Sequence, residues 1–161
     1  MKPRDNDYTV LFGESYLKTV LSDPAGFFGR FYELFQRADP RVTGFFSKTD
    51  IARQLSMLEE SLLHMVDFSR SRVPSKRIED LADYHGENRM NIPARLFEVW
   101  LECLLDTLRE RDREFDKDTE TAWRVILAPG LAYMKSRCSG RPDRNGDEVT
   151  GGPQDKGETA S

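Results

Sequence analysis

The spacing of apolar residues along the chain predicts an all-α fold. Apolar side chains recur at helical intervals in almost every segment between residues 7 and 138, while no stretch shows the sustained two-residue alternation of a half-buried strand. The most aromatic segment is SDPAGFFGRFYELFQR, in which Ser22 is the expected N-cap and Pro24 lies in the first turn. Its broad apolar face consists of Phe27, Phe28, Phe31, Tyr32, Leu34 and Phe35.

A tight corner is predicted to follow this helix. The segment RVTGFFSK, residues 41–48, is short and places Gly44 between turn-prone residues. This pattern favours a corner over a long helix. The next helix is expected to begin at Thr49 or Asp50, because both side chains can accept a hydrogen bond from the first turn. The corner therefore carries two phenylalanines, Phe45 and Phe46, between the two helices.

The helix after the corner carries a regular apolar stripe. Gln54 lies at one border of the stripe, and His64 points about 120° from its centre, which predicts a solvent-facing ring. Polar residues and Pro74 within residues 67–76 should end the helix. The stripe consists of Ile51, Leu55, Leu58, Leu62 and Met65.

Two further helices are expected on either side of a histidine. The first is short and ends near Gly86, directly after His85, and the second begins at Asn91 and Pro93. The second has the strongest helical periodicity in the chain. The apolar positions are Ile78, Leu81 and Ala82 in the first helix, and Phe97, Trp100, Leu101, Leu104 and Leu108 in the second.

The last predicted helix runs from about Thr119 to Met134. Pro129 and Gly130 lie inside it and should kink it or break it locally, because proline cannot donate the backbone hydrogen bond. Residues 140–161 are rich in Gly, Pro and charge and have almost no apolar side chain, so a disordered tail is expected after a single domain of residues 1–139.

Composition narrows the classes of function. The 161 residues carry 32% charged side chains and a net charge of −4, a balance that supports neither a nucleic-acid partner nor an anionic membrane surface. The first ten residues lack the apolar core of a signal peptide, so a soluble, cytoplasmic protein is expected. Cys103 and Cys138 form no zinc-binding or disulfide pattern and are expected to be ordinary thiols.

The order of several motifs resembles that of a known family. The motifs are FYELFQRADP, the FFSKTD corner with RQLSML after it, and LADYH, which ends at His85. Together they resemble a globin over roughly residues 8–138, and the resemblance is closest to bacterial single-domain globins and the haem domain of flavohaemoglobins. It implies a globin fold of about six to eight helices around a haem pocket, with haem b as the cofactor.

The resemblance assigns a role to the histidine at the end of LADYH. His85 matches the proximal haem ligand, and it becomes the expected metal-binding residue. A neutral imidazole is a nitrogen donor suited to iron, and a single axial histidine leaves the sixth position free for a gaseous ligand. His64 is the only other histidine, and its outward position makes it a poor competitor.

Other cofactor-binding residues follow from the same resemblance. Tyr32 and Gln54 match the two distal positions that face bound ligand, where a phenol O–H and an amide N–H can donate to it. Phe46 matches the corner phenylalanine that packs on the haem, while a one-residue slip would select Phe45 and exchange Tyr32 for Phe31. Further expected pocket residues are Leu58 beside the ligand, with Leu81, Ile92, Phe97 and Trp100 around the proximal side and the haem edge.

The sequence departs from flavohaemoglobins on the proximal side. Those proteins support the ligand histidine with a tyrosine early in the following helix and a glutamate on the last helix, and both make the imidazole more electron-donating. Here Leu96 or Phe97 takes the place of the tyrosine, and the last helix ends with Lys135, Ser136 and Arg137 and has no glutamate in reach. Strong peroxidase-like or nitric-oxide dioxygenase chemistry is therefore not favoured.

The resulting functional hypothesis is reversible O₂ binding at ferrous haem iron, for storage or delivery. NO, CO and anions of ferric haem are further candidate ligands. Two alternatives stay open at this point. One is a nitric-oxide dioxygenase that relies on an external reductase, because the chain has no room for a flavin or nicotinamide module, and the other is a haem-based gas or redox sensor. A monomer or a homodimer is expected.

Overall fold

The structure is a computed structural model that describes residues 5–46, 50–86 and 92–138, with the backbone alone at residues 5–7, 46 and 51. These residues form helices and no strands, which confirms the all-α prediction. The helices are α1 (Asp5–Thr19), α2 (Pro24–Ala38), α3 (Pro40–Phe46), α4 (Ile51–Ser71), α5 (Lys76–His85), α6 (Ala94–Arg111) and α7 (Lys117–Ser136). The predicted tail at 140–161 lies outside the described residues.

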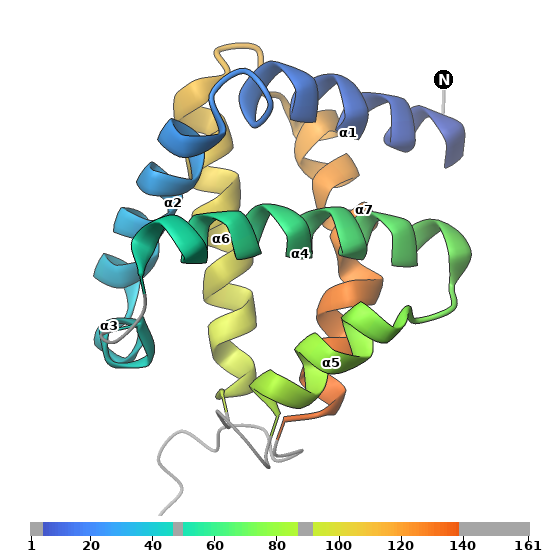
Figure 1. The fold of residues 1–161 in the computed structure, drawn as a ribbon. Coiled ribbons are helices and arrows are strands. Elements are labelled where there is room, and N and C mark those ends of the chain that lie inside the picture. The colour runs from blue at the N-terminus through green and yellow to red at the C-terminus, as the bar shows by residue number, and fades with distance from the viewer. Residues whose placement is uncertain (1–4, 47–49, 87–91, 139–161) are drawn as a thin grey trace, which may run out of the picture.

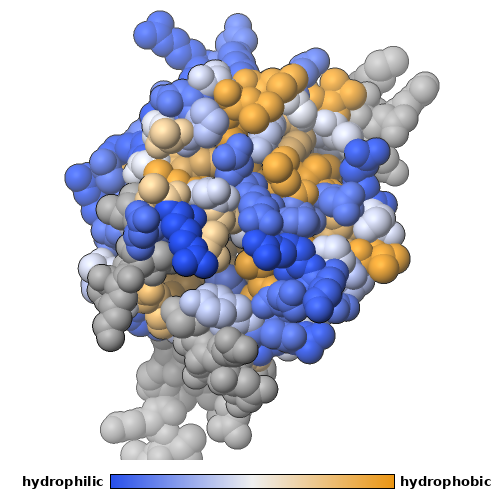
Figure 2. All heavy atoms as spheres, viewed as in Figure 1, coloured by the Kyte–Doolittle hydropathy of each residue, from blue (hydrophilic) through white to orange (hydrophobic). Residues whose placement is uncertain are grey.

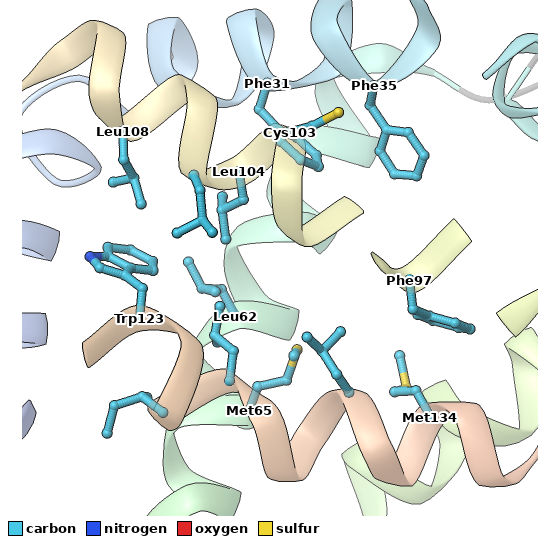
Figure 3. Close-up of a cluster of buried hydrophobic side chains, with 14 of the residues drawn as sticks. Phe31, Phe35, Leu62, Met65, Phe97, Cys103, Leu104, Leu108, Trp123 and Met134 are labelled. Atoms are coloured by element: carbon cyan, nitrogen blue, oxygen red, sulfur yellow. The ribbon is translucent and has the colours of Figure 1, made fainter. Parts of the chain in front are cut away.

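The helices cross one another around a shared core (Figure 1). Helices α1, α4 and α5 all pack on α7, while α2 packs on α6 and α3 on α2. Figure 3 shows Leu104 and Leu108 of α6 pointing toward Trp123 of α7, with Leu62 of α4 beside them. These four side chains have 1% of their surface or less exposed, and burying each one contributes about 1.5–3 kcal/mol.

The start of α2 corrects one expectation. Asp23, and not Ser22, is the N-cap, because its Oδ1 accepts a hydrogen bond from the Gly26 N–H at 3.1 Å. The Ser22 hydroxyl instead donates to the Lys18 carbonyl, 2.8 Å away, at the end of α1. Pro24 occupies the first turn of α2 as predicted. The two adjacent polar residues thus serve different helices.

Helix α4 ends within the polar stretch of residues 67–76, as the sequence pattern indicated. It continues through the first polar residues after position 66 to Ser71, and Arg72 then ends it with a φ of 59°. Phe68 packs its ring edge-to-face on Tyr133 of α7, with 5.6 Å between centroids. Asp50 caps the start of α4 by accepting from the Ala52 N–H, while Thr49 lies outside the described residues.

Helix α6 begins at Ala94, directly after Pro93, and Asn91 lies outside the described residues. Helix α7 is continuous from Lys117 to Ser136, so the local break predicted at Pro129 and Gly130 does not occur. Gly130 faces Met65 of α4 so closely that a Cβ atom at this position would lie 2.8 Å from the Met65 Cγ. The glycine lets α4 and α7 approach each other inside the core.

The outer surface carries several apolar side chains. Figure 2 shows orange residues gathered in the upper part of the view. Val10 and Leu17 of α1, and Leu21 just after it, are about half exposed or more. Blue, hydrophilic residues cover most of the remaining face. Among the described helices, none combines the length and the apolar character that a membrane crossing requires.

Candidate functional site

A cavity of about 620 Å³ lies between the helices, well within the usual size of a ligand or cofactor site. Side chains of α2 to α7, together with residues just before α4 and α6, form its wall, and most of that wall is aromatic or aliphatic. The lining residues are Phe31, Tyr32, Phe35, Val42, Phe45, Asp50, Arg53, Gln54, Met57, Leu58, Ser61, Met65, Leu81, Tyr84, His85, Ile92, Leu96, Phe97, Trp100, Leu131 and Met134.

The structure brings the predicted site residues together around this cavity. The residues in question are Tyr32, Gln54, Leu58, Leu81, His85, Ile92, Phe97 and Trp100. The side chain of Phe46 lies outside the described part of the structure, so its contact with a cofactor stays a prediction. Phe45 and Phe31, which belong to the alternative alignment, both line the cavity.

His85 is the last residue of α5 and is half-buried. Its Nδ1 atom lies 2.7 Å from the Leu81 carbonyl oxygen, one turn earlier in the same helix. A carbonyl can only accept, so Nδ1 carries the proton and Nε2 holds a lone pair. Burial lowers the pKa of His85 below its usual value, and the hydrogen bond to Leu81 offsets this only partly, so the ring is neutral near pH 7.

Two aromatic rings hold the His85 imidazole in place. Tyr84 lies edge-to-face with it at a centroid distance of 5.5 Å, and Phe97 of α6 does so at 6.1 Å. Within the described residues, no hydrogen-bond partner is recorded for Nε2, although the ring lines the cavity. The arrangement presents one neutral nitrogen donor in a wall that is mostly aromatic or aliphatic.

Tyr32 and Gln54 supply polar groups to the same cavity from α2 and α4. Tyr32 is 9% exposed, and burial raises the pKa of its phenol, while a hydrogen bond with Gln36 acts in the opposite direction. The phenol is therefore protonated at neutral pH and can donate a hydrogen bond. Gln54 is half-buried near the start of α4, whose position is fixed by the Asp50 cap.

Sequence reasoning missed several cavity residues on α4. Met57, Ser61 and Met65 share the face of Gln54 and Leu58, and Arg53 lies beside them at the wall. The spacing from 54 to 57 or 58, 61 and 65 is the helical repeat of three or four, so the signal was present in the sequence. Ser61 is polar, so it was not counted as part of an apolar wall. In the structure its hydroxyl is satisfied within the helix, because it donates to the Met57 carbonyl at 2.7 Å.

His64 does not line the cavity. Its side chain is 32% exposed, which makes it less open to solvent than the sequence pattern indicated, and its Nε2 lies 3.7 Å from Glu60 Oε1 on the preceding turn. The two histidines of the chain therefore have different environments. Only His85 presents its imidazole to the cavity.

Comparison with other proteins identifies one similar solved structure. It is a protein from Pseudomonas aeruginosa PAO1 whose crystal structure is described as structurally highly homologous to a human haemoglobin. The two chains are 28% identical, with a TM-score of 0.74, and the match covers 82% of this chain and 99% of the other. No protein-family model matches the sequence, and no curated protein matches it either.

Proposed function

We propose that this chain, which has a globin fold, binds haem b through His85 and binds O₂ reversibly at the ferrous iron. The observation that carries the proposal is the neutral His85 imidazole, with Nδ1 held by the Leu81 carbonyl and a lone pair left on Nε2 in the wall of an apolar cavity. The similarity to a protein described as structurally highly homologous to a human haemoglobin supports the same conclusion.

The residues of the cavity fit a haem in their chemistry. When bound, haem would supply an iron that accepts a nitrogen ligand from the protein and a diatomic ligand. Metal-binding histidines usually donate their other ring N–H to a carbonyl or carboxylate, which is the arrangement of His85 and Leu81. Phe35, Phe97 and Trp100 offer the apolar contacts that a flat aromatic cofactor requires.

Tyr32 and Gln54 are proposed to stabilise the bound ligand. Both can donate a hydrogen bond inside a cavity whose remaining wall is mostly apolar, and such bonds are stronger where water is excluded. Leu58 lies on the same helix one turn after Gln54 and helps to exclude water. These residues favour retention of a small polar ligand over its release.

The proximal side supports reversible binding over vigorous catalysis. The Nδ1 atom of His85 donates to a neutral backbone carbonyl, and Phe97, which carries no polar atom, occupies the ring contact on α6. A carboxylate acceptor would make the imidazole a stronger electron donor than a carbonyl does. The described residues therefore give His85 a moderate donor strength.

The decisive experiment is an absorption spectrum of the purified protein, ferric and ferrous, with and without O₂ and CO. Wild-type protein should show a Soret band that shifts with each ligand. His85→Ala should lose haem or change its coordination, whereas the matched control His64→Ala should keep the wild-type spectra. An unchanged Soret band in His85→Ala would disprove the assignment of the axial ligand.

A second measurement separates carrier from enzyme. The O₂-bound ferrous protein should oxidise one equivalent of nitric oxide to nitrate and be left ferric; for a carrier, an added reductase and electron donor should return the ferric protein to the ferrous state too slowly to sustain consumption in the presence of O₂. Sustained consumption over many equivalents would contradict a simple carrier and favour a nitric-oxide dioxygenase.

A further inference from the structure

The end of α7 packs directly on the end of α5, where His85 is located. Figure 1 shows the two helix ends converging at the bottom of the molecule, and the two helices are in contact. The residues involved are Arg137 and Cys138, just after α7, and His85 and Gly86 at the end of α5. Nothing in the proposed function assigns a role to this contact.

Position 86 requires a glycine because neighbouring atoms leave no room for a side chain, and not because of its backbone conformation. Its φ is −78°, which any residue can adopt. A Cβ atom at this position would nevertheless lie 2.6 Å from the Arg137 carbonyl oxygen and 3.1 Å from the Ala82 carbonyl oxygen. Both neighbours are backbone atoms, which cannot rotate away as a side chain can. Any side chain here must push the two helix ends apart.

The His85 carbonyl links the end of α5 to the residue before α6 and to the end of α7. It accepts from the Ile92 N–H at 3.0 Å, and the Cys138 Sγ atom lies 3.7 Å from it. The same thiol lies 3.5 Å from the Met134 carbonyl of α7, so its single proton can serve either helix. Cys138 is 4% exposed, and it fills the space between α5 and α7.

An exposed ion pair adds little to this contact. The Arg137 guanidinium lies 3.4 Å from Asp83 of α5 and also donates to the Tyr133 hydroxyl at 3.0 Å. About half of the Arg137 side chain is exposed, and exposed pairs of this kind contribute at most about 1 kcal/mol. The close backbone approach at Gly86 and the buried Cys138 thiol therefore carry the contact.

We infer that Gly86 and Cys138 are positioning residues for His85, which set the direction of its imidazole in the cavity. The inference rests on the proposed binding of haem iron by His85. The ring is tied by Nδ1 to Leu81 in the same helix, so a shift of the last turn of α5 moves the ring with it. Residues that orient a metal ligand in this way typically change metal affinity by about 10- to 100-fold when altered.

Gly86→Ala tests the inference, with Gly29→Ala as the matched control, because a Cβ atom at Gly29 meets nothing within 4 Å. In the ferrous, ligand-free protein, Gly86→Ala should shift the iron–histidine stretching band in the resonance Raman spectrum and accelerate haem loss to an acceptor apoglobin about tenfold. Gly29→Ala should change neither. If both variants keep the wild-type band and rate of haem loss, the inference is wrong.

A second pair of variants covers the case in which Gly86→Ala does not fold. Cys138→Ala should shift the same band, while Cys103→Ala, which removes an equally buried thiol from the core of α6, should not. If the wild-type protein binds no haem, the proposed function fails by itself. The His85 ring resonances in the NMR spectrum of the full chain then decide on positioning, because Gly86→Ala should move them and Gly29→Ala should leave them unchanged.

Discussion

The Nδ1 atom of His85 donates a hydrogen bond to the carbonyl oxygen of Leu81 over 2.7 Å. Both residues belong to the last turns of α5, so a single short helix would supply both the proposed haem ligand and the group that orients it. The bond selects one tautomer of the neutral ring and leaves Nε2 as the basic nitrogen. It is the local feature on which the proposed axial bond depends.

The tautomer of His85 can be measured without haem. In the haem-free protein near pH 7, we expect a protonated Nδ1 and an unprotonated Nε2, because the Leu81 carbonyl accepts from the former. Nitrogen-15 shifts of the ring, correlated with its carbon-bound protons, distinguish the two nitrogens. A ring protonated on Nε2 would contradict the orientation described for His85.

Tyr32 and Gln54 should each slow the release of O₂. If one hydrogen bond contributes about 1 kcal/mol, Tyr32→Phe or Gln54→Leu should raise the O₂ dissociation rate roughly fivefold. If the two hydrogen bonds act independently, the double variant should lose about twice the stabilisation of bound O₂ that each single variant loses. Stopped-flow displacement of O₂ by CO measures the rates, and wild-type rates in both single variants would refute the proposed role.

Tyr16 provides the matched control for the loss of a tyrosine hydroxyl. It is 7% exposed, lies outside the cavity, and its hydroxyl has no hydrogen-bond partner among the described residues. Tyr16→Phe should leave the O₂ dissociation rate unchanged. It should also raise the free energy of unfolding by about 1 kcal/mol, because it removes a buried polar atom that is not satisfied. Urea denaturation measures this second effect.

The apolar pattern predicted the helices better than their ends. Periodicity located the buried faces because burial of those faces drives folding, as at Leu62 and Leu104. The end of a helix depends on a single capping hydrogen bond, and the side chains of Ser22 and Asp23 can both accept one. Only the backbone geometry decides that Asp23 caps α2. The sequence placed the end of α4 within residues 67–76 but not at Ser71, because Phe68 meets Tyr133 of α7 in a contact between residues far apart in the sequence.

The cap of α2 predicts a dependence of stability on pH. The hydrogen bond from the Gly26 N–H and, to a smaller extent, the one from the Arg111 side chain lower the pKa of Asp23 below its usual value of 3.8. The folded chain therefore holds the proton less readily than the unfolded chain does. The stabilisation from Asp23 is present above pH 3.8 and is lost as the pH falls through its lower folded pKa.

Asp23→Asn isolates this effect, because asparagine also caps helices but does not titrate. The difference in free energy of unfolding between wild type and Asp23→Asn should decrease when the pH falls below 3.8. Ser22→Ala, one residue away, should keep the pH profile of the wild type. A constant difference between wild type and Asp23→Asn across this range would show that the ionised carboxylate does not stabilise the fold.

The candidate site was predictable where the sequence contains distinctive residue types. Histidine is rare in this chain, and the order of Tyr32, Gln54 and His85 resembles that of a known family, so these residues could be singled out. The structure adds the tautomer of His85. It also adds the close contact between Gly86 and the Arg137 carbonyl, which depends on the path of the chain after α7. Sequence periodicity could not foresee that contact, since it joins positions about 50 residues apart.

Gly130 offers a test of how the core shapes the cavity. A Cβ atom here would lie 2.8 Å from the Met65 Cγ and 3.1 Å from the Met65 Cβ, so Gly130→Ala must displace the side chain near its base. Met65 lines the cavity, and its displacement should lower haem affinity. Although alanine favours a helix by about 1 kcal/mol over glycine, overpacking costs about 1–3 kcal/mol, so a net loss of stability is expected.

Urea denaturation and haem titration of Gly130→Ala measure the two effects, with Gly29→Ala as the reference. Gly29 has open space around it, so its replacement should raise the free energy of unfolding by about 0.5–1 kcal/mol and leave haem affinity unchanged. A Gly130→Ala protein that gains as much stability as Gly29→Ala would show that α4 and α7 can separate freely. Their close approach would then not determine the size of the cavity.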